Sequence, residues 1–329
     1  MTSHAPVTFL TADPAQSPTV SVEPIMLSAP ERGEDLQIRV SAPIVGDRLP
    51  VILMAHGFAK SMRDYAPLVD HWTRQGFAVI QPTFLDSATL NLSPDDPRSP
   101  DIWRHRVRDM TRVLDHLGEI EAAVPSLTGR LDHERIAAVG HSYGAQTVGI
   151  LLGARVFEFD GSVTDDMSDH RIRAGVLLSA AGEGGAYLSP FAAENFPFMS
   201  PSFAELATPA LVIAGDKDDS PLSTRGPDWF TDAYWLSPGA DALVTLFDGE
   251  HLLGGITGYR SADTTDENPE RVAAVSDLST AYLRRALDGD EAVWSAVTET
   301  LRAQDAPIGS LQQKGVGQQP VAPQKGLDR

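Results

Sequence analysis

The chain of 329 residues contains no cysteine. Disulfides, zinc–thiolate sites, iron–sulfur clusters and a cysteine nucleophile are therefore excluded. Basic residues are scarce as well, because 26 Lys and Arg stand against 45 Asp and Glu, for a formal net charge of −19. A protein of this charge repels nucleic acid and anionic membrane surfaces, so we expect neither as a partner.

Long apolar runs are also missing. No stretch of about 18 consecutive apolar residues is present, as a membrane-spanning helix would require. Residues 1–10 lack the basic segment followed by an apolar one that marks a signal peptide, so we expect a cytoplasmic protein. The length fits one large domain or two smaller ones, and the apolar content of 42% is that of an ordinary globular chain. Nothing in the sequence indicates the oligomeric state.

Short apolar runs alternate along the chain with segments of helical periodicity. The strand-like runs cover residues 50–55, 77–80, 136–139, 174–179, 209–214 and, as the last strand, 243–247. Uninterrupted apolar strands alternating with helices predict an α/β fold with a mostly parallel sheet and helices on both faces. Two further strand-like segments, 20–27 and 36–41, are joined by a short turn-like connection, which predicts an antiparallel N-terminal edge.

The remaining segments suggest one main domain with loose ends. We expect residues 1–19 to form a loose lead-in, 20–305 the folded domain and 306–329 a flexible tail rich in Gln, Gly, Pro and Lys. Residues 84–100 read as a long loop. An insert rich in Gly, Phe and Pro, 182–208, is a candidate for a small cap.

A helix is predicted from about Asp101, because large apolar residues recur there at spacings of three and four. These residues are Trp103, Val107, Met110, Leu114 and Leu117. The same segment carries four arginines, which we interpret as its solvated surface: Arg104, Arg106, Arg108 and Arg112.

The most informative motif is Gly140-His-Ser142-Tyr-Gly144, which follows a strand-like run and precedes a helix-favouring segment. This is the sequence form of a nucleophile elbow, a sharp strand-to-helix turn with a serine at its apex. The glycines are needed because Cβ atoms at these positions would collide across the turn. Ser142 is therefore the candidate nucleophile.

A serine hydroxyl needs a base within hydrogen-bond reach and an acid that orients the base. Sites built on such an elbow present these groups in the chain order Ser, Asp or Glu, His. Of nine histidines only His170 and His251 follow Ser142. His170 has no acid-bearing strand end between it and the elbow, whereas His251 lies just after the predicted last strand. We therefore choose His251 as the base.

The acid is expected after the preceding strand, which ends in Gly215-Asp216-Lys217-Asp218-Asp219. Some of these aspartates can simply cap the turn, since Asp bonds readily to nearby backbone N–H groups. Asp218 is our choice for the triad acid, and Asp216 is the alternative. For the aspartate-rich segment 216–219 as a whole, we expect the side chains to cap the turn rather than to bind a cation.

Acyl transfer also requires donors for a developing oxyanion. The backbone N–H of Tyr143 is one candidate, and the N–H of Phe58, in the His56-Gly57-Phe58 segment after an earlier strand, is the other. The Phe58 and Tyr143 side chains, with Leu252 and Leu253, are candidate walls of the substrate pocket. We expect His56 to make a structural hydrogen bond.

The chain resembles the alpha/beta-hydrolase superfamily over residues 49–287, on four motifs taken in order: His56-Gly-Phe58, Gly140-His-Ser-Tyr-Gly144, Gly215-Asp-Lys-Asp218 and His251. The family's usual Gly-x-x-Asp arrangement favours Asp218 as the acid. Within the superfamily the chain looks most like the serine-dependent predicted dienelactone hydrolases, relatives of bacterial chlorophyllases, platelet-activating-factor acetylhydrolases and polyester-cleaving cutinases. True dienelactone hydrolases use a cysteine, which this chain lacks.

The resemblance implies an alpha/beta-hydrolase fold and a carboxylesterase that acts on a small-molecule ester without cofactor or metal. The aromatic residues of the 182–208 insert favour an apolar ester over a charged one. Two alternatives stay open: a serine peptidase or amidase with the same machinery, and a non-catalytic binding protein of the same fold.

Overall fold

The computed structural model describes residues 18–315, apart from residues 94, 159–160, 260 and 305. The predicted lead-in lies almost entirely outside the described residues, as does the end of the predicted tail.

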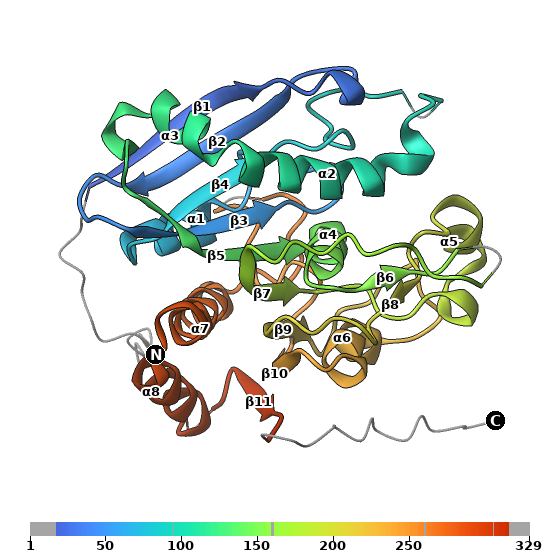
Figure 1. The fold of residues 1–329 in the computed structure, drawn as a ribbon. Helices are drawn as coiled ribbons and strands as arrows, with labels where there is room; N and C mark the ends of the chain where they lie inside the picture. Colours follow the sequence, from blue (N-terminus) through green and yellow to red (C-terminus); the bar gives the residue numbers. More distant parts are fainter. Residues whose placement is uncertain (1–17, 94, 159–160, 260, 305, 316–329) are drawn as a thin grey trace.

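Within the described residues, nine strands form one sheet in the order β1-β2-β4-β3-β5-β7-β9-β10-β11 (Figure 1). The strands are β1 (Thr19–Leu27), β2 (Leu36–Pro43), β3 (Leu49–Ala55), β4 (Ala78–Pro82), β5 (Leu131–His141), β7 (Ile172–Leu178), β9 (Ala210–Gly215), β10 (Ala240–Leu246) and β11 (Gly309–Gln313). The six central strands, β4 to β10 in the sheet order, run parallel. The pairs β1–β2, β2–β4 and β10–β11 are antiparallel. The expected α/β fold with a mostly parallel sheet and an antiparallel N-terminal edge is confirmed.

Helices cover both faces of this sheet. One face carries α1 (Ala66–Arg74), α7 (Pro269–Asp288) and α8 (Glu291–Arg302), and the other carries α2 (Ile102–Asp115), α3 (Leu117–Ala123) and α4 (Tyr143–Leu151). Strand β3 shows the division, because successive side chains of a strand point to opposite faces. Ile52 and Met54 belong to the core with α1 and α7, whereas Val51 and Leu53 belong to the core with α2 and α4.

Helix α7 carries clear local signals at both of its ends. The Asn268 side chain caps the first turn by accepting hydrogen bonds from two backbone N–H groups, and Pro269 occupies the first helical position. Gly289 ends the helix in the left-handed conformation that glycine adopts without strain.

The remaining elements are short. They are β6 (Arg155–Val156), β8 (Pro201–Ser202), α5 (Pro190–Asn195), α6 (Asp232–Leu236) and the 3-10 turns η1 (Pro30–Arg32), η2 (Ser99–Asp101), η3 (Pro125–Leu127), η4 (Gly185–Tyr187) and η5 (Pro227–Thr231). The 182–208 insert packs against the main body. Its strand β8 pairs with β6, and its residues Ala192 and Met199 share a small apolar core with Trp229 and Phe230 of η5.

The C-terminal predictions need correction. Residues 243–247 overlap β10, which is not the last strand, and the predicted flexible tail from 306 is wrong over Gly309–Gln313. These residues form β11, which pairs with β10 at the edge of the sheet. Separately, none of the helices described is both long and apolar enough to cross a lipid bilayer.

Candidate active site

The turn from β5 to α4 has the geometry of a nucleophile elbow. Ser142 has φ 56° and ψ −121°, a strained conformation for a residue with a side chain. A Cβ on Gly140 would lie 2.2 Å from the Gly144 carbonyl oxygen, and one on Gly144 would lie 2.1 Å from the Ala55 carbonyl oxygen. Glycine at both positions therefore lets the elbow close on itself and lets α4 pack directly against the end of β3.

Three side chains from three strand ends meet at this turn. The Ser142 Oγ lies 2.9 Å from Nε2 of His251, and Nδ1 of the same ring lies 3.0 Å from each carboxylate oxygen of Asp218. The acceptor oxygens on Nδ1 require the ring proton on that nitrogen, which leaves the Nε2 lone pair facing the serine hydroxyl. Asp218 is completely buried, whereas 37% of the His251 side chain is exposed. The base is thus accessible and its carboxylate partner is shielded from water.

The competing sequence candidates lie elsewhere. Asp216 accepts a hydrogen bond of 2.7 Å from the Asp248 backbone N–H, so it holds the turns after β9 and β10 together. Asp219 is exposed, and His170 is exposed on the turn before β7. Asp218 is therefore the carboxylate that the structure brings to His251.

The segment after β3 lies against the elbow. It contains Phe58, whose backbone N–H is the second predicted oxyanion donor. Among the described residues, neither the Phe58 N–H nor the Tyr143 N–H donates a hydrogen bond. The Gly57 N–H, in contrast, donates to the Tyr65 hydroxyl at 2.8 Å. Phe58 and Tyr143 thus retain the unengaged backbone donors that an oxyanion would need.

A directional chain of hydrogen bonds links this segment to the base. The His141 Nε2 donates to the His251 carbonyl at 2.8 Å, so its Nδ1 is the acceptor and receives the Tyr65 hydroxyl at 2.9 Å. Burial lowers the pKa of His141 to about 3, which keeps its ring neutral and this tautomer intact. The backbone of His251 is thereby fixed to the same network as Gly57.

His56 is buried and makes structural hydrogen bonds. Its Nδ1 donates to the Gly57 carbonyl at 2.7 Å, and its Nε2 accepts from the Phe84 N–H at 3.0 Å. Burial lowers the pKa of His56 to about 3. The neutral ring therefore links the segment after β3 to the start of the loop between β4 and η2.

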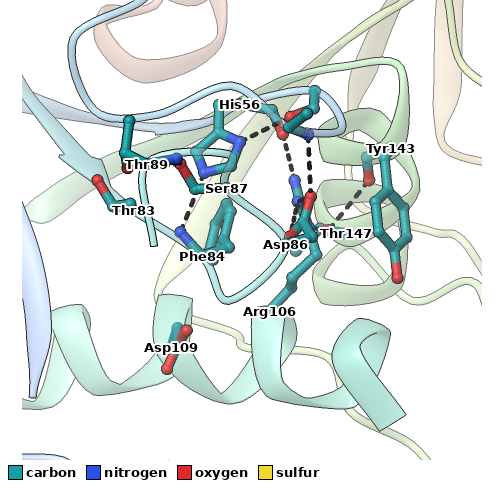
Figure 2. A network of polar contacts seen from close by, with 12 residues as sticks. His56, Thr83, Phe84, Asp86, Ser87, Thr89, Arg106, Asp109, Tyr143 and Thr147 are labelled. Carbon is teal, nitrogen blue, oxygen red and sulfur yellow. Dashed lines mark hydrogen bonds and ion pairs between the residues drawn. The ribbon is translucent and has the colours of Figure 1, made fainter. Parts of the chain in front are cut away.

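The interpretation of Arg106 as a surface residue is wrong. Its side chain is completely buried and forms an ion pair with Asp86, whose side chain is 1% exposed. Figure 2 shows this pair beneath His56 and beside Tyr143. One signal was available in the sequence: Arg106 lies three residues after Trp103 and four before Met110, at the border of the apolar face.

The predicted pocket walls differ in their surroundings. Phe58 is 61% exposed, and Leu252 is half-buried. Leu253 is completely buried in the core with α7. The Tyr143 ring stacks on Phe198 of the insert with ring centroids 5.6 Å apart. A residue that sequence reasoning did not single out, Phe230, packs its ring 5.5 Å from the His251 ring.

Within the part of the chain that the structure describes, no three His, Asp or Glu side chains form a group that could hold a metal ion.

Comparison with known proteins identifies the family. The family model described as the alpha/beta hydrolase family matches residues 52–320, a stretch that includes Ser142, Asp218 and His251. No curated protein matches the chain.

Proposed function

The chain belongs to the alpha/beta hydrolase family, and from that premise we propose that it is a serine esterase that hydrolyses apolar carboxylic esters through an acyl-enzyme on Ser142. The observation that carries the proposal is the continuous contact from Ser142 through His251 to Asp218, at 2.9 Å and 3.0 Å. The first is a distance at which a base takes a proton from a hydroxyl, and the second is a hydrogen bond that orients the base.

The proposed reaction has two halves. The Ser142 oxygen attacks the ester carbonyl carbon while Nε2 of His251 takes the hydroxyl proton. The negative oxygen of the tetrahedral intermediate accepts hydrogen bonds from the Phe58 and Tyr143 N–H groups. The alcohol leaves with the proton from His251, and water, activated by the same ring, then releases the acid and regenerates Ser142. Asp218 stabilises the imidazolium in both halves.

The side chains around the site support an apolar substrate. The exposed Phe58 ring adjoins one oxyanion donor. From the other donor, Tyr143, a series of ring contacts runs through Phe198 and Phe196 to Phe191, with centroids 5.6, 6.1 and 5.7 Å apart. Phe191 ends this series at the surface and is 58% exposed. Such an aromatic tract favours an aromatic or long-chain acyl group over a charged one.

We assign the chain to the serine-dependent branch near the predicted dienelactone hydrolases, chlorophyllases and cutinases, on the motifs around Phe58, Ser142 and Asp218. Phthalate, chlorophyll-like and polyester model esters form the substrate panel that tests this assignment. Peptide anilides in the same panel test the amidase alternative, which faster anilide than ester hydrolysis would favour.

A fluorophosphonate probe and a nitrophenyl ester test the activity itself. Wild-type protein should form a covalent adduct on Ser142, and Ser142→Ala and His251→Ala should abolish turnover without unfolding the chain. Asp218→Asn should lower kcat by about 10³–10⁴-fold, because the ring then loses its orienting anion. The matched variant Asp216→Asn should change kcat by less than about twofold, since that carboxylate holds a turn. A folded wild type without adduct or turnover would favour the non-catalytic alternative.

A further inference from the structure

The buried guanidinium of Arg106 lies between the two backbone segments that carry the proposed oxyanion donors. These segments, residues 56–59 after β3 and 143–147 at the start of α4, are far apart in the chain. Every polar nitrogen of Arg106 has a partner: Nε contacts Thr147, Nη1 contacts Asp86 and Nη2 contacts His56. Figure 2 shows the three contacts spreading from one planar group.

The first set of contacts holds the segment that carries Phe58. Arg106 Nη2 donates to the His56 carbonyl oxygen. Its ion-pair partner Asp86 accepts the Ala59 N–H at 3.4 Å. The peptide group of Phe58 therefore lies between two backbone atoms that the Arg106–Asp86 pair contacts.

The second set holds the segment that carries Tyr143. Arg106 Nε donates to the Thr147 hydroxyl at 3.0 Å, and that hydroxyl donates to the Tyr143 carbonyl at 3.1 Å. The guanidinium plane also lies between two rings, 4.1 Å from the Phe84 centroid and 4.3 Å from the Tyr143 centroid. The residue whose N–H is the second donor is thus fixed by its carbonyl and by its ring.

We propose that Arg106 is a positioning residue that sets the separation and alignment of the Phe58 and Tyr143 N–H groups. The inference rests on the proposed esterase function. A planar cation with several fixed donors suits the task, because it can bond to two elements and a carboxylate while stacking on aromatic rings. A lysine retains the charge for Asp86, but its single nitrogen cannot reproduce the fork or the stacking.

The effect should appear in the chemical step. Hydrogen bonds to the oxyanion strengthen as charge develops, so misplaced donors lower kcat and leave ground-state binding unchanged. Loss of one oxyanion donor typically costs about 10²–10³ in kcat, and displacement of both by part of an ångström is expected to reach the lower end of that range.

The experiment compares Arg106→Lys with Arg32→Lys. Arg32 is an equally buried arginine, 1% exposed, and it pairs with Asp109, which lies on the same helix as Arg106. Its other donors go to the carbonyl oxygens of Glu34, Asp35 and Thr83, so among the described residues it makes no hydrogen bond to 56–59 or 143–147. We expect Arg106→Lys to lower kcat for a nitrophenyl ester about 10–100-fold with KM within about twofold. The same variant should slow fluorophosphonate labelling, and Arg32→Lys should leave both within about twofold of wild type.

Thr147→Val provides a second arm that keeps the ion pair intact and is nearly isosteric. It removes only the hydroxyl between Arg106 and the Tyr143 carbonyl, and it should lower kcat about 5–10-fold at constant KM. Circular dichroism checks that each variant is folded, and the pH profile of kcat should keep its shape because His251 and Asp218 are untouched.

Three results would overturn the inference. The first is that Arg106→Lys folds and keeps the wild-type kcat. The second is that Arg32→Lys loses as much kcat as Arg106→Lys does. The third applies if Arg106→Lys does not fold, and is that Thr147→Val keeps the wild-type kcat. In each case active wild-type enzyme leaves the proposed function standing, whereas a wild type that neither labels nor turns over ends both.

Discussion

Adding one methyl group at Gly144 should lower the proposed hydrolase activity strongly while leaving Ser142, Asp218 and His251 in place. A Cβ there would lie 2.1 Å from the Ala55 carbonyl oxygen and 2.7 Å from that of His56. Both atoms belong to backbone, so no side chain can swing away. Since real Cβ contacts stay above 3.0 Å, α4 and the end of β3 must separate by about 1 Å in Gly144→Ala.

This separation falls between the two proposed oxyanion donors. Overpacking of this kind costs about 1–3 kcal/mol of folding free energy, and a misplacement of about 1 Å at a reacting centre costs about 10²-fold in rate. We therefore expect Gly144→Ala to lose about 1–3 kcal/mol in urea unfolding and about 100-fold in kcat for a nitrophenyl ester.

Gly149→Ala is the matched control on the same helix. A Cβ at this position would find its nearest neighbour, the Ala154 Cβ, at an ordinary 3.9 Å. Alanine inside a helix is favoured over glycine by up to about 1 kcal/mol, so this variant should be at least as stable as wild type and fully active. Gly144→Ala with wild-type kcat would refute the argument that glycine is required there for close packing.

The other predictions concern buried polar groups and the sheet edge. Tyr65→Phe removes the hydroxyl between the Gly57 N–H and His141, and should lower the free energy of urea unfolding by about 2 kcal/mol because both partners stay buried; an unchanged value would contradict the directional network. His56 and His141, with pKa values lowered to about 3 by burial, stay neutral when folded but take up protons below pH 6.5 when unfolded, so stability falls as the pH falls. Burial also lowers the pKa of His71 to about 4, which adds to the loss, whereas burial raises the pKa of Asp109 to about 7, which offsets one of the three histidines. We therefore expect a net loss of about 2–4 kcal/mol between pH 7 and pH 5 in urea titrations; equal stability would be inconsistent with neutral buried rings. A chain that ends before β11 should melt earlier and scatter light, because β10 becomes an open edge; an unchanged melting temperature would contradict a stabilising role for this pairing.

The sequence predicts most of the sheet and the order of the candidate triad for local reasons. Uninterrupted apolar runs mark strands buried on both faces, and the caps of α7 are short-range signals. Chain order then leaves His251 as the histidine that follows the predicted last parallel strand. The choice of Asp218 over Asp216 came from the family resemblance; the spacing alone left both open, since either side chain can cap a turn.

The parts that escaped prediction depend on partners distant in the chain. Arg106 is buried because Asp86, the His56 carbonyl and two aromatic rings surround it, and no local pattern shows that set. Strand β11 (Gly309–Gln313) is mostly polar and does not alternate, so it becomes a strand only by pairing with β10. At both places the local sequence predicts the structure poorly, because contacts with distant residues determine the burial of Arg106 and the extended conformation of β11.

The long loop after β4 divides into two parts with different tolerance to redesign. Phe84 and Asp86 are bonded to His56 and Arg106, which hold the segment after β3, so an engineered insertion should leave these two residues unchanged. Asn91 and Ser93 are exposed farther along the same loop, and exposed loop tips are where insertions are accommodated. A peptide tag or a small binding module spliced between those two residues should leave turnover intact, which makes this tip a practical handle for immobilising the enzyme.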